Sequence, residues 1–246
     1  MTEFYGLKHH SPSALNLAAG NLALYFLEKV KGIKTPGSCA MFRGTASETG
    51  IVHGLVNPTA PVQECQDAAL AQYDKLSALS GDPKRQKERD AIPGIVEQGI
   101  MALRPYGIPD EIQVKVLHEL PGVKLPILGF CDLGWTYHGI RLDIKSQLAL
   151  SSEPSEPHRR QVATYIHNTN SAGRLAYITP KKHGVYLVDD AATDMRALTS
   201  IAQRVERFLS LSKDPAELAS LLIPDYSSFY WNDPNLRNAG REVFGF

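Results

Sequence analysis

The hydrophobic pattern of this chain changes from helical to extended spacing near Tyr106, and that change limits the folds open to it. Over residues 11–30, behind a Ser-Pro capping signal, apolar residues recur every three or four positions, which indicates a helix. Beyond Tyr106, Ile112, Val114 and Val116 alternate with polar residues, which is typical of a half-buried strand. Helices followed by strands predict an α/β or α+β protein.

The remaining pattern predicts a central mixed sheet flanked by helices. The expected helices cover residues 11–30, 45–56, 60–79, 89–103, 158–168 and 195–211, and the expected strands cover 112–116, 125–135, 140–148, 174–179 and 185–188. No repeat, low-complexity segment or linker separates these elements, so we expect one domain over residues 1–246.

Charge, hydropathy and cysteine content restrict function and location. The chain has 26 basic and 26 acidic residues, so its formal net charge is zero and coating of nucleic acid through bulk positive charge is not expected. The apolar stretch 14–27 is too short and too interrupted to span a bilayer, and no secretory signal is recognisable. The three cysteines show no C-x-x-C spacing. We therefore expect a cytoplasmic protein without a membrane span.

The strongest chemical signal is the segment Leu142-Asp143-Ile144-Lys145 on the third expected strand. Side chains alternate across a strand, so Asp143 and Lys145 share one face. A carboxylate there can bind a hard divalent cation, and the lysine ammonium then lies beside the water that the metal activates. The alternative is a solvated strand face without chemistry.

A second carboxylate is expected close to the first. Asp132 lies on the preceding strand, and the short His138-Gly139 turn folds that strand back beside the third. Two neighbouring carboxylates repel each other unless a cation lies between them, which favours metal binding. The alternative is that Asp132 forms an ion pair with Arg141 across the hairpin.

Two helices carry further candidates. Glu48 can supply a third carboxylate, or act as a negative charge near a helix start, and His53 follows on an adjoining helix face. Gln161 and Tyr165 are four residues apart and share one helix face, with His158 on the same side. An amide and a phenol directed at carboxylates can position a water or a phosphate; the alternative is a tyrosine ring packed inward.

The order of these parts resembles the PD-(D/E)xK nuclease superfamily, in particular its RecB-type and YqaJ-type exonucleases and their phage-encoded relatives. The matching pieces are a helix with Arg43-Gly44-x-x-x-Glu48, a strand with Gly129-x-x-Asp132, a strand with Asp143-Ile144-Lys145 and a helix with Gln161-x-x-x-Tyr165. The resemblance implies a restriction-endonuclease-like core at about residues 43–188, with a helical N-terminal region and a helical, aromatic C-terminal extension.

The resemblance also implies residue roles. Asp132 and Asp143 would be metal-binding carboxylates, with the Ile144 carbonyl as a backbone ligand, and Glu48 would complete the metal site. Many RecB-type members carry a histidine on the first-motif helix, so His53 is an alternative ligand. The implied catalytic residues are Glu48, Asp132, Asp143, Lys145, Gln161 and Tyr165, where Lys145 would orient the attacking water and Gln161 and Tyr165 would position the substrate.

The implied substrate is DNA and the implied cofactor is Mg²⁺ or Mn²⁺. With three cysteines, the iron–sulfur cluster that some relatives hold on four cysteines is not expected. A single-strand annealing protein and a second copy of the chain are candidate partners. The expected DNA contacts are Ser11, Ser13, Arg43, His158, Arg159 and Arg160.

The function expected from this resemblance is a metal-dependent DNA exonuclease that serves phage recombination or DNA processing in the host cytoplasm. An endonuclease with the same fold is one alternative. A binding module for DNA or protein, with a nuclease-like fold and no catalysis, is another.

Overall fold

A computed structural model describes residues 3–34 and 37–245, so the outermost residues of the predicted domain (1, 2 and 246) and residues 35 and 36 lie outside the described part. Contacts divide the chain into two compact units. Unit 1 contains residues 3–34, 115–129 and 192–245, and unit 2 contains residues 37–114 and 130–191. The expected nuclease core at about residues 43–188 therefore falls mostly in unit 2.

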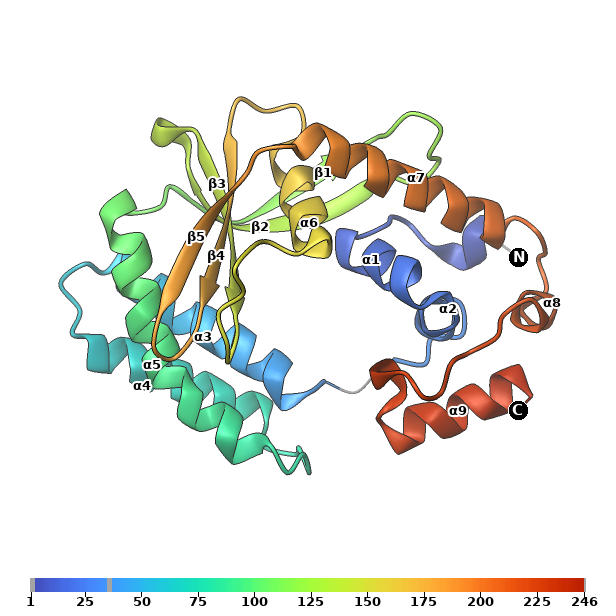
Figure 1. Cartoon of the computed structure of the whole chain (residues 1–246), viewed down its shortest axis with the longest axis horizontal. Helices are drawn as coiled ribbons and strands as arrows, with labels where there is room; N and C mark the ends of the chain where they lie inside the picture. The colour runs from blue at the N-terminus through green and yellow to red at the C-terminus, as the bar shows by residue number, and fades with distance from the viewer. Residues whose placement is uncertain (1–2, 35–36, 246) are drawn as a thin grey trace. The chain divides into compact units, whose positions relative to one another are not determined.

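Three helices form one layer of unit 2: α3 (Cys39–Val56), α4 (Val62–Leu76) and α5 (Arg85–Leu103), the last followed by the short η2 (Arg104–Tyr106) (Figure 1). Glycines let these helices approach closely. A methyl group on Gly50 would lie 2.5 Å from the carbonyl oxygen of Cys65, and one on Gly54 would lie 2.6 Å from the Ile100 side chain. The tight packing fixes α3, which carries Glu48.

The sheet has five strands in the order β1-β2-β3-β4-β5. Its strands are β1 (Glu111–His118), β2 (Ile127–Trp135), β3 (Ile140–Ser146), β4 (Ala172–Ile178) and β5 (His183–Val188). Strands β2 and β3 are antiparallel, β3 and β4 are parallel, and β4 and β5 are antiparallel. The expected α/β class with a mixed sheet is confirmed.

The predicted hairpin between β2 and β3 is also confirmed. A single 3-10 turn, η3 (Thr136–His138), ends at Gly139, whose φ of 60° is the left-handed conformation that glycine adopts without strain. Leu133 then lies opposite Leu142 in the ladder. Continuing this register by one residue brings Asp132 opposite Asp143, as the candidate site requires.

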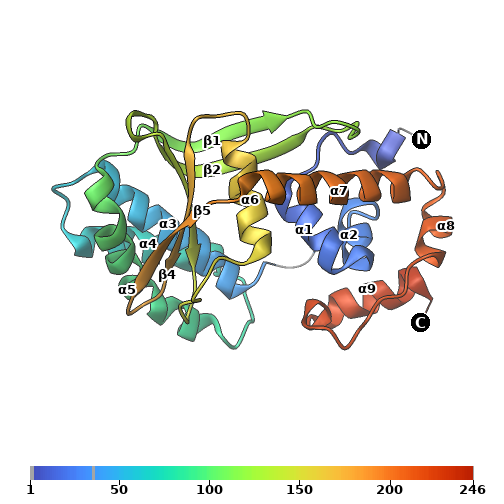
Figure 2. The same cartoon turned by 45° about the horizontal axis from the view of Figure 1, so that its top comes forward.

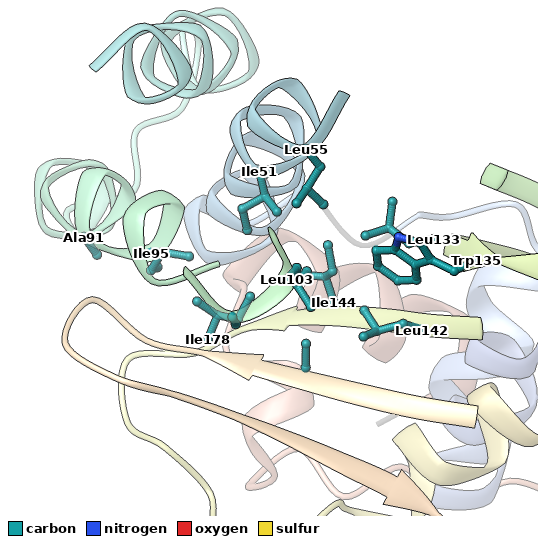
Figure 3. Close-up of a cluster of buried hydrophobic side chains, with 12 residues drawn as sticks. Ile51, Leu55, Ala91, Ile95, Leu103, Leu133, Trp135, Leu142, Ile144 and Ile178 are labelled. Carbon is teal, nitrogen blue, oxygen red and sulfur yellow. The ribbon is translucent and has the colours of Figure 1, made fainter. Parts of the chain in front are cut away.

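The main core of unit 2 lies between the sheet and α3 and α5. Leu142 and Ile144 of β3 belong to this cluster together with Ile51 of α3 and Ile95 of α5 (Figure 3). Since side chains alternate along a strand, Asp143 is directed to the opposite face. Helix α6 (Glu156–Ile166), which connects β3 to β4, packs on these strands, and both views place it across the sheet from α3 and α5 (Figures 1 and 2).

Unit 1 is mainly helical. Its elements are η1 (Glu3–Gly6), α1 (Pro12–Gly20), α2 (Leu22–Lys29), most of α7 (Ala191–Leu209), α8 (Pro215–Ser220), η4 (Phe229–Trp231) and α9 (Pro234–Phe244) (Figure 2). The buried Glu206 carboxylate on α7 accepts the backbone N–H groups of Lys124 and Leu125 at 2.8 Å each and lies 3.2 Å from His10 Nε2. This network holds three separate segments of unit 1 together.

The prediction of a single helix over residues 11–30 is wrong in one respect, because the structure has two helices there. Ser11 caps α1 as expected, with its hydroxyl accepting the N–H of Ala14 at 3.2 Å. The helix then breaks at Asn21, whose side-chain oxygen accepts the N–H of Leu24 at 2.9 Å and caps α2.

Over residues 3–34 and 37–245, no helix has the length and apolar character needed to cross a membrane.

Candidate functional site

The predicted D-x-K pair lies on the β3 face that is directed at α6. Asp143 is fully buried, and Lys145 Nζ lies 2.7 Å from its Oδ2 as an ion pair. This oxygen accepts no aligned hydrogen bond. The other carboxylate oxygen, Oδ1, accepts the phenol hydrogen of Tyr165 at 3.4 Å. The site therefore has a buried carboxylate whose negative charge is offset mainly by one ammonium.

Asp132 is tied to the same strand through the backbone. Its Oδ2 accepts the N–H of Ile144, the residue between Asp143 and Lys145, at 2.7 Å. The alternative in which Asp132 pairs with Arg141 is wrong, because Arg141 forms its ion pair with Glu111 at 3.1 Å. Asp132 therefore belongs to a cluster of carboxylates with Asp143 and Glu48, which we call the acidic cluster.

Glu48 of α3 joins the cluster through a residue that sequence reasoning missed. The side-chain amide of Gln113 on β1 donates hydrogen bonds to Glu48 Oε1 and, at 3.1 Å, to Asp132 Oδ1. Gln113 was one of the polar residues that alternate along the first strand, a position that ordinarily faces solvent. Its backbone φ of 52° is unusual for a strand residue, and a strand pattern does not reveal it.

The electrostatics of the cluster show how closely its charges lie. Burial, followed by repulsion from Asp143 and Glu48, raises the pKa of Asp132 well above its ordinary value. Burial also raises the pKa of Glu48, against the effect of the hydrogen bond from Gln113. For Lys145, burial lowers the pKa, but the combined attraction of Asp143, Asp132 and Glu48 outweighs it, so the net shift is upward and the side chain stays charged. An added cation would relieve the repulsion among the carboxylates.

The expected pair on α6, Gln161 and Tyr165, contacts the cluster through a chain of two hydrogen bonds. Gln161 Nε2 donates to the Tyr165 hydroxyl at 2.6 Å, and Tyr165 in turn donates to Asp143. Burial, with the nearby charge of Asp143, raises the pKa of Tyr165, so the phenol keeps its proton. His158 lies on the same helix with Nδ1 2.8 Å from the Tyr177 hydroxyl, and burial together with the charge of Lys145 lowers its pKa.

The structure does not bring His53 into the cluster. Its Nε2 pairs with Glu64 of α4 at 2.8 Å. Because His53 and Glu48 lie on different faces of α3, one side chain is directed at α4 and the other at β1. Glu48 is therefore the acid of this helix that reaches the site, and the alternative ligand His53 is not supported.

The expected DNA contact Arg43 has a structural position instead. Its guanidinium is buried, forms an ion pair with Glu88 of α5 and donates to the Ser146 carbonyl at 3.2 Å. Ser146 directly follows Lys145, so Arg43 fixes the end of β3. A buried guanidinium with these partners is poorly placed to contact a DNA phosphate.

The other expected DNA contacts remain predictions. Arg160 pairs with Glu156 one turn earlier at 3.1 Å, and Arg159 donates to the Pro154 carbonyl at 3.2 Å. In unit 1, the hydroxyl groups of Ser11 and Ser13 lie 3.2 Å apart, and the Ser11 hydroxyl also caps α1.

The donor chemistry of the cluster fits a hard divalent cation. In the described part of the chain, no group of three or more His, Cys, Asp or Glu side chains forms a ready-made metal site. The groups that converge are carboxylate oxygens, which Mg²⁺ and Mn²⁺ prefer, and Asp143 Oδ2 is a buried oxygen without an aligned hydrogen bond. The Ile144 carbonyl as a metal ligand stays a prediction.

Comparison with known proteins gives little further information. No protein-family model and no curated protein matches the chain. One similar solved structure, described as "Crystal structure of SSO0001", has 19% sequence identity and a TM-score of 0.36, with 75% of this chain and 84% of that chain covered. At this level the similarity supports no argument about function.

Proposed function

We propose that this protein is a divalent-metal-dependent deoxyribonuclease that hydrolyses phosphodiester bonds, acting as an exonuclease. The observation that carries the proposal is that Asp143 and Lys145 form an ion pair at 2.7 Å while Asp132 accepts the N–H of the residue between them, Ile144, at 2.7 Å, within one unit. Glu48 is added to them through Gln113. Carboxylates crowded around one lysine have no evident structural purpose, but they suit a reaction at a phosphate.

Glu48, Asp132 and Asp143 would hold Mg²⁺ or Mn²⁺, with the Ile144 carbonyl as a fourth oxygen donor. The bound ion would lower the pKa of a water and polarise the phosphoryl oxygen. The backbone hydrogen bond to Asp132 and the phenol of Tyr165 on Asp143 hold both carboxylates in fixed orientations. Such preorganisation is what a catalytic carboxylate needs.

Lys145 is positioned to act on the reacting atoms. Its side chain is 24% accessible, which leaves room for a substrate contact while the ammonium pairs with Asp143. In the reaction, the oxygen of a water bonds to phosphorus, the bond from phosphorus to the 3′ oxygen breaks, and the leaving oxygen receives a proton. Lys145 would orient that water and stabilise the negative charge that builds on the phosphate.

DNA cleavage separates this proposal from its alternatives. End-labelled linear DNA and closed-circular DNA are incubated with Mg²⁺, Mn²⁺ or EDTA, with the wild type, Asp143→Asn and the control Asp67→Asn, which changes an exposed carboxylate on α4. We expect metal-dependent loss of linear DNA alone, absent with Asp143→Asn and retained with Asp67→Asn. Nicked circles would favour an endonuclease. Binding without cleavage under every metal would favour a non-catalytic module.

A further inference from the structure

Gln113 has an unusual backbone at a point where a strand should be regular. Four non-glycine residues among those described have a positive φ, and Gln113, at 52°, is the one that lies within a strand. Such a conformation is disfavoured for a residue with a side chain, and it persists where surrounding contacts hold it. The Gln113 side chain makes two such contacts, with Glu48 and with Asp132.

The amide of Gln113 lies between two carboxylates. An amide nitrogen carries two hydrogens, and here Nε2 donates to both Glu48 Oε1 and Asp132 Oδ1. The reverse orientation would direct the amide oxygen at two acceptors, so the chemistry supports the assigned one. Gln113 therefore links α3 to β2 with a neutral donor, at a point where two like charges would otherwise repel.

A neutral amide and a divalent cation satisfy the same two oxygens in different ways. The amide offers partial positive charge and fixed geometry, whereas the cation offers full charge but needs direct access to the oxygens. Both cannot lie between Glu48 and Asp132 at once. Among the described residues, the carboxylates do not form a ready-made metal site while the amide lies between two of them.

We propose that the Gln113 amide holds Glu48 and Asp132 in place when no divalent cation is bound, and is displaced from between them when the cation binds. This inference rests on the proposed metal-dependent function. It makes Gln113 a positioning residue that stabilises the metal-free protein and sets the affinity for the metal. Removing the amide should therefore destabilise the metal-free protein and tighten metal binding.

The test uses two Gln113 variants and one matched control. Gln113→Gly removes the amide and suits the positive φ, so it is expected to fold, and Gln113→Ala removes the amide while keeping a Cβ. Gln86→Ala is the control, because Gln86 is likewise a surface glutamine that donates to an aspartate, Asp90, at 2.7 Å. Mn²⁺ affinity is measured by calorimetry, and melting temperature is measured in EDTA.

We expect Gln113→Ala to melt at lower temperature in EDTA, and Gln113→Gly to lose less because glycine relieves the positive φ. Both should bind Mn²⁺ about three- to tenfold more tightly, the equivalent of one displaced hydrogen bond. The control should match the wild type in both. A merely structural role for Gln113 would weaken Mn²⁺ binding, and unchanged or weaker binding by both variants would overturn the inference alone. A wild type that binds no Mn²⁺, or binding that survives in Asp132→Asn, would overturn the proposed function as well.

Discussion

Asp132 Oδ2 accepts the backbone N–H of Ile144 at 2.7 Å, so a side chain of β2 is bonded to the main chain of β3. The contact lies just beyond the Leu133–Leu142 pair, where the regular ladder ends. It fixes one acid against the residue that separates Asp143 from Lys145. The orientation of the acid thus depends on the backbone of the hairpin, and substitutions that keep an acceptor at residue 132 should keep the local structure.

Lys145→Met should reduce both stability and activity. The ammonium is the principal charged partner of Asp143, whose side chain is 1% exposed, and its removal leaves a buried carboxylate unpaired. We expect the free energy of unfolding in EDTA to fall by about 3 kcal/mol. We also expect the cleavage rate to fall about 10²- to 10³-fold, with less effect on metal affinity. Urea unfolding and single-turnover cleavage measure these quantities.

The double variant Lys145→Met with Asp143→Asn is the control for the stability effect. Since the second change removes the unpaired charge, it should recover most of the lost stability, while cleavage should be absent as in Asp143→Asn alone. If the two stability losses simply add, the ion pair is not the cause.

Arg43→Ala should be strongly destabilising although Arg43 lies outside the acidic cluster. It leaves the buried carboxylate of Glu88 without its partner and frees the Ser146 carbonyl, which costs about 3 to 5 kcal/mol. Arg43→Lys should rescue this only in part, because an ammonium cannot contact both partners as a planar guanidinium does. Urea unfolding of both variants, alone and combined with Glu88→Gln, tests the pairing. Strict additivity of the Arg43→Ala and Glu88→Gln effects would contradict it.

Two glycines on α3 form a matched pair. A methyl group on Gly50 would lie 2.5 Å from a backbone oxygen of α4, which cannot move cheaply, so Gly50→Ala should destabilise by about 1 to 3 kcal/mol. A methyl group on Gly44 meets its nearest neighbour, the Ser146 hydroxyl, at 3.7 Å. Gly44→Ala should therefore be neutral or stabilise by up to about 1 kcal/mol through helix propensity. Thermal melts of the two variants decide; equal losses would show that the helix packing is described wrongly.

Unit 1 should lose stability at mildly acidic pH through His10. Burial lowers the pKa of His10 below its ordinary value of 6.5, although Glu206 opposes this shift. At a pH above that value, the ring is neutral in both the folded and the unfolded protein and contributes nothing to the pH dependence of stability. Below it the unfolded chain takes up a proton that the folded chain does not, so the free energy of unfolding falls as the pH falls.

His10→Gln isolates this contribution. Between about pH 7.5 and about pH 5.5, the wild type should lose up to about 1 kcal/mol more than the variant, because each pH unit is worth about 1.4 kcal/mol per proton. Urea unfolding at the two pH values measures the difference. A variant with the same pH slope as the wild type would exclude His10 as the source.

Local patterns in the sequence were sufficient to predict on which strand or helix face the main side chains of the candidate site lie. The period of two along a strand placed Asp143 and Lys145 on one face, and the ion pair between them confirms it. The His138-Gly139 turn predicted the hairpin that brings Asp132 to β3. Helical spacing predicted that Gln161 and Tyr165 share one helix face, and there the two side chains are hydrogen-bonded. Each of these inferences depends on residues close together in the chain.

What could not be predicted depends on residues far apart in sequence. Arg43 forms its ion pair with Glu88 on another helix, and the burial of Arg43 follows from the packing of α3 on α5. Gln113 contacts Glu48 across 65 positions, through a backbone conformation that the strand pattern conceals. Periodicity carries no information about such tertiary contacts.

The most direct test of the central claim is single-turnover cleavage of end-labelled linear DNA during a Mg²⁺ titration, with the wild type and Asp132→Asn. The asparagine oxygen can still accept the Ile144 N–H, so the fold should persist while one charged oxygen donor is lost. We predict saturable Mg²⁺-dependent cleavage by the wild type and a rate about 10²- to 10³-fold lower for a folded Asp132→Asn protein. Cleavage that persists in EDTA, or an Asp132→Asn protein that cuts at the wild-type rate, would contradict the account.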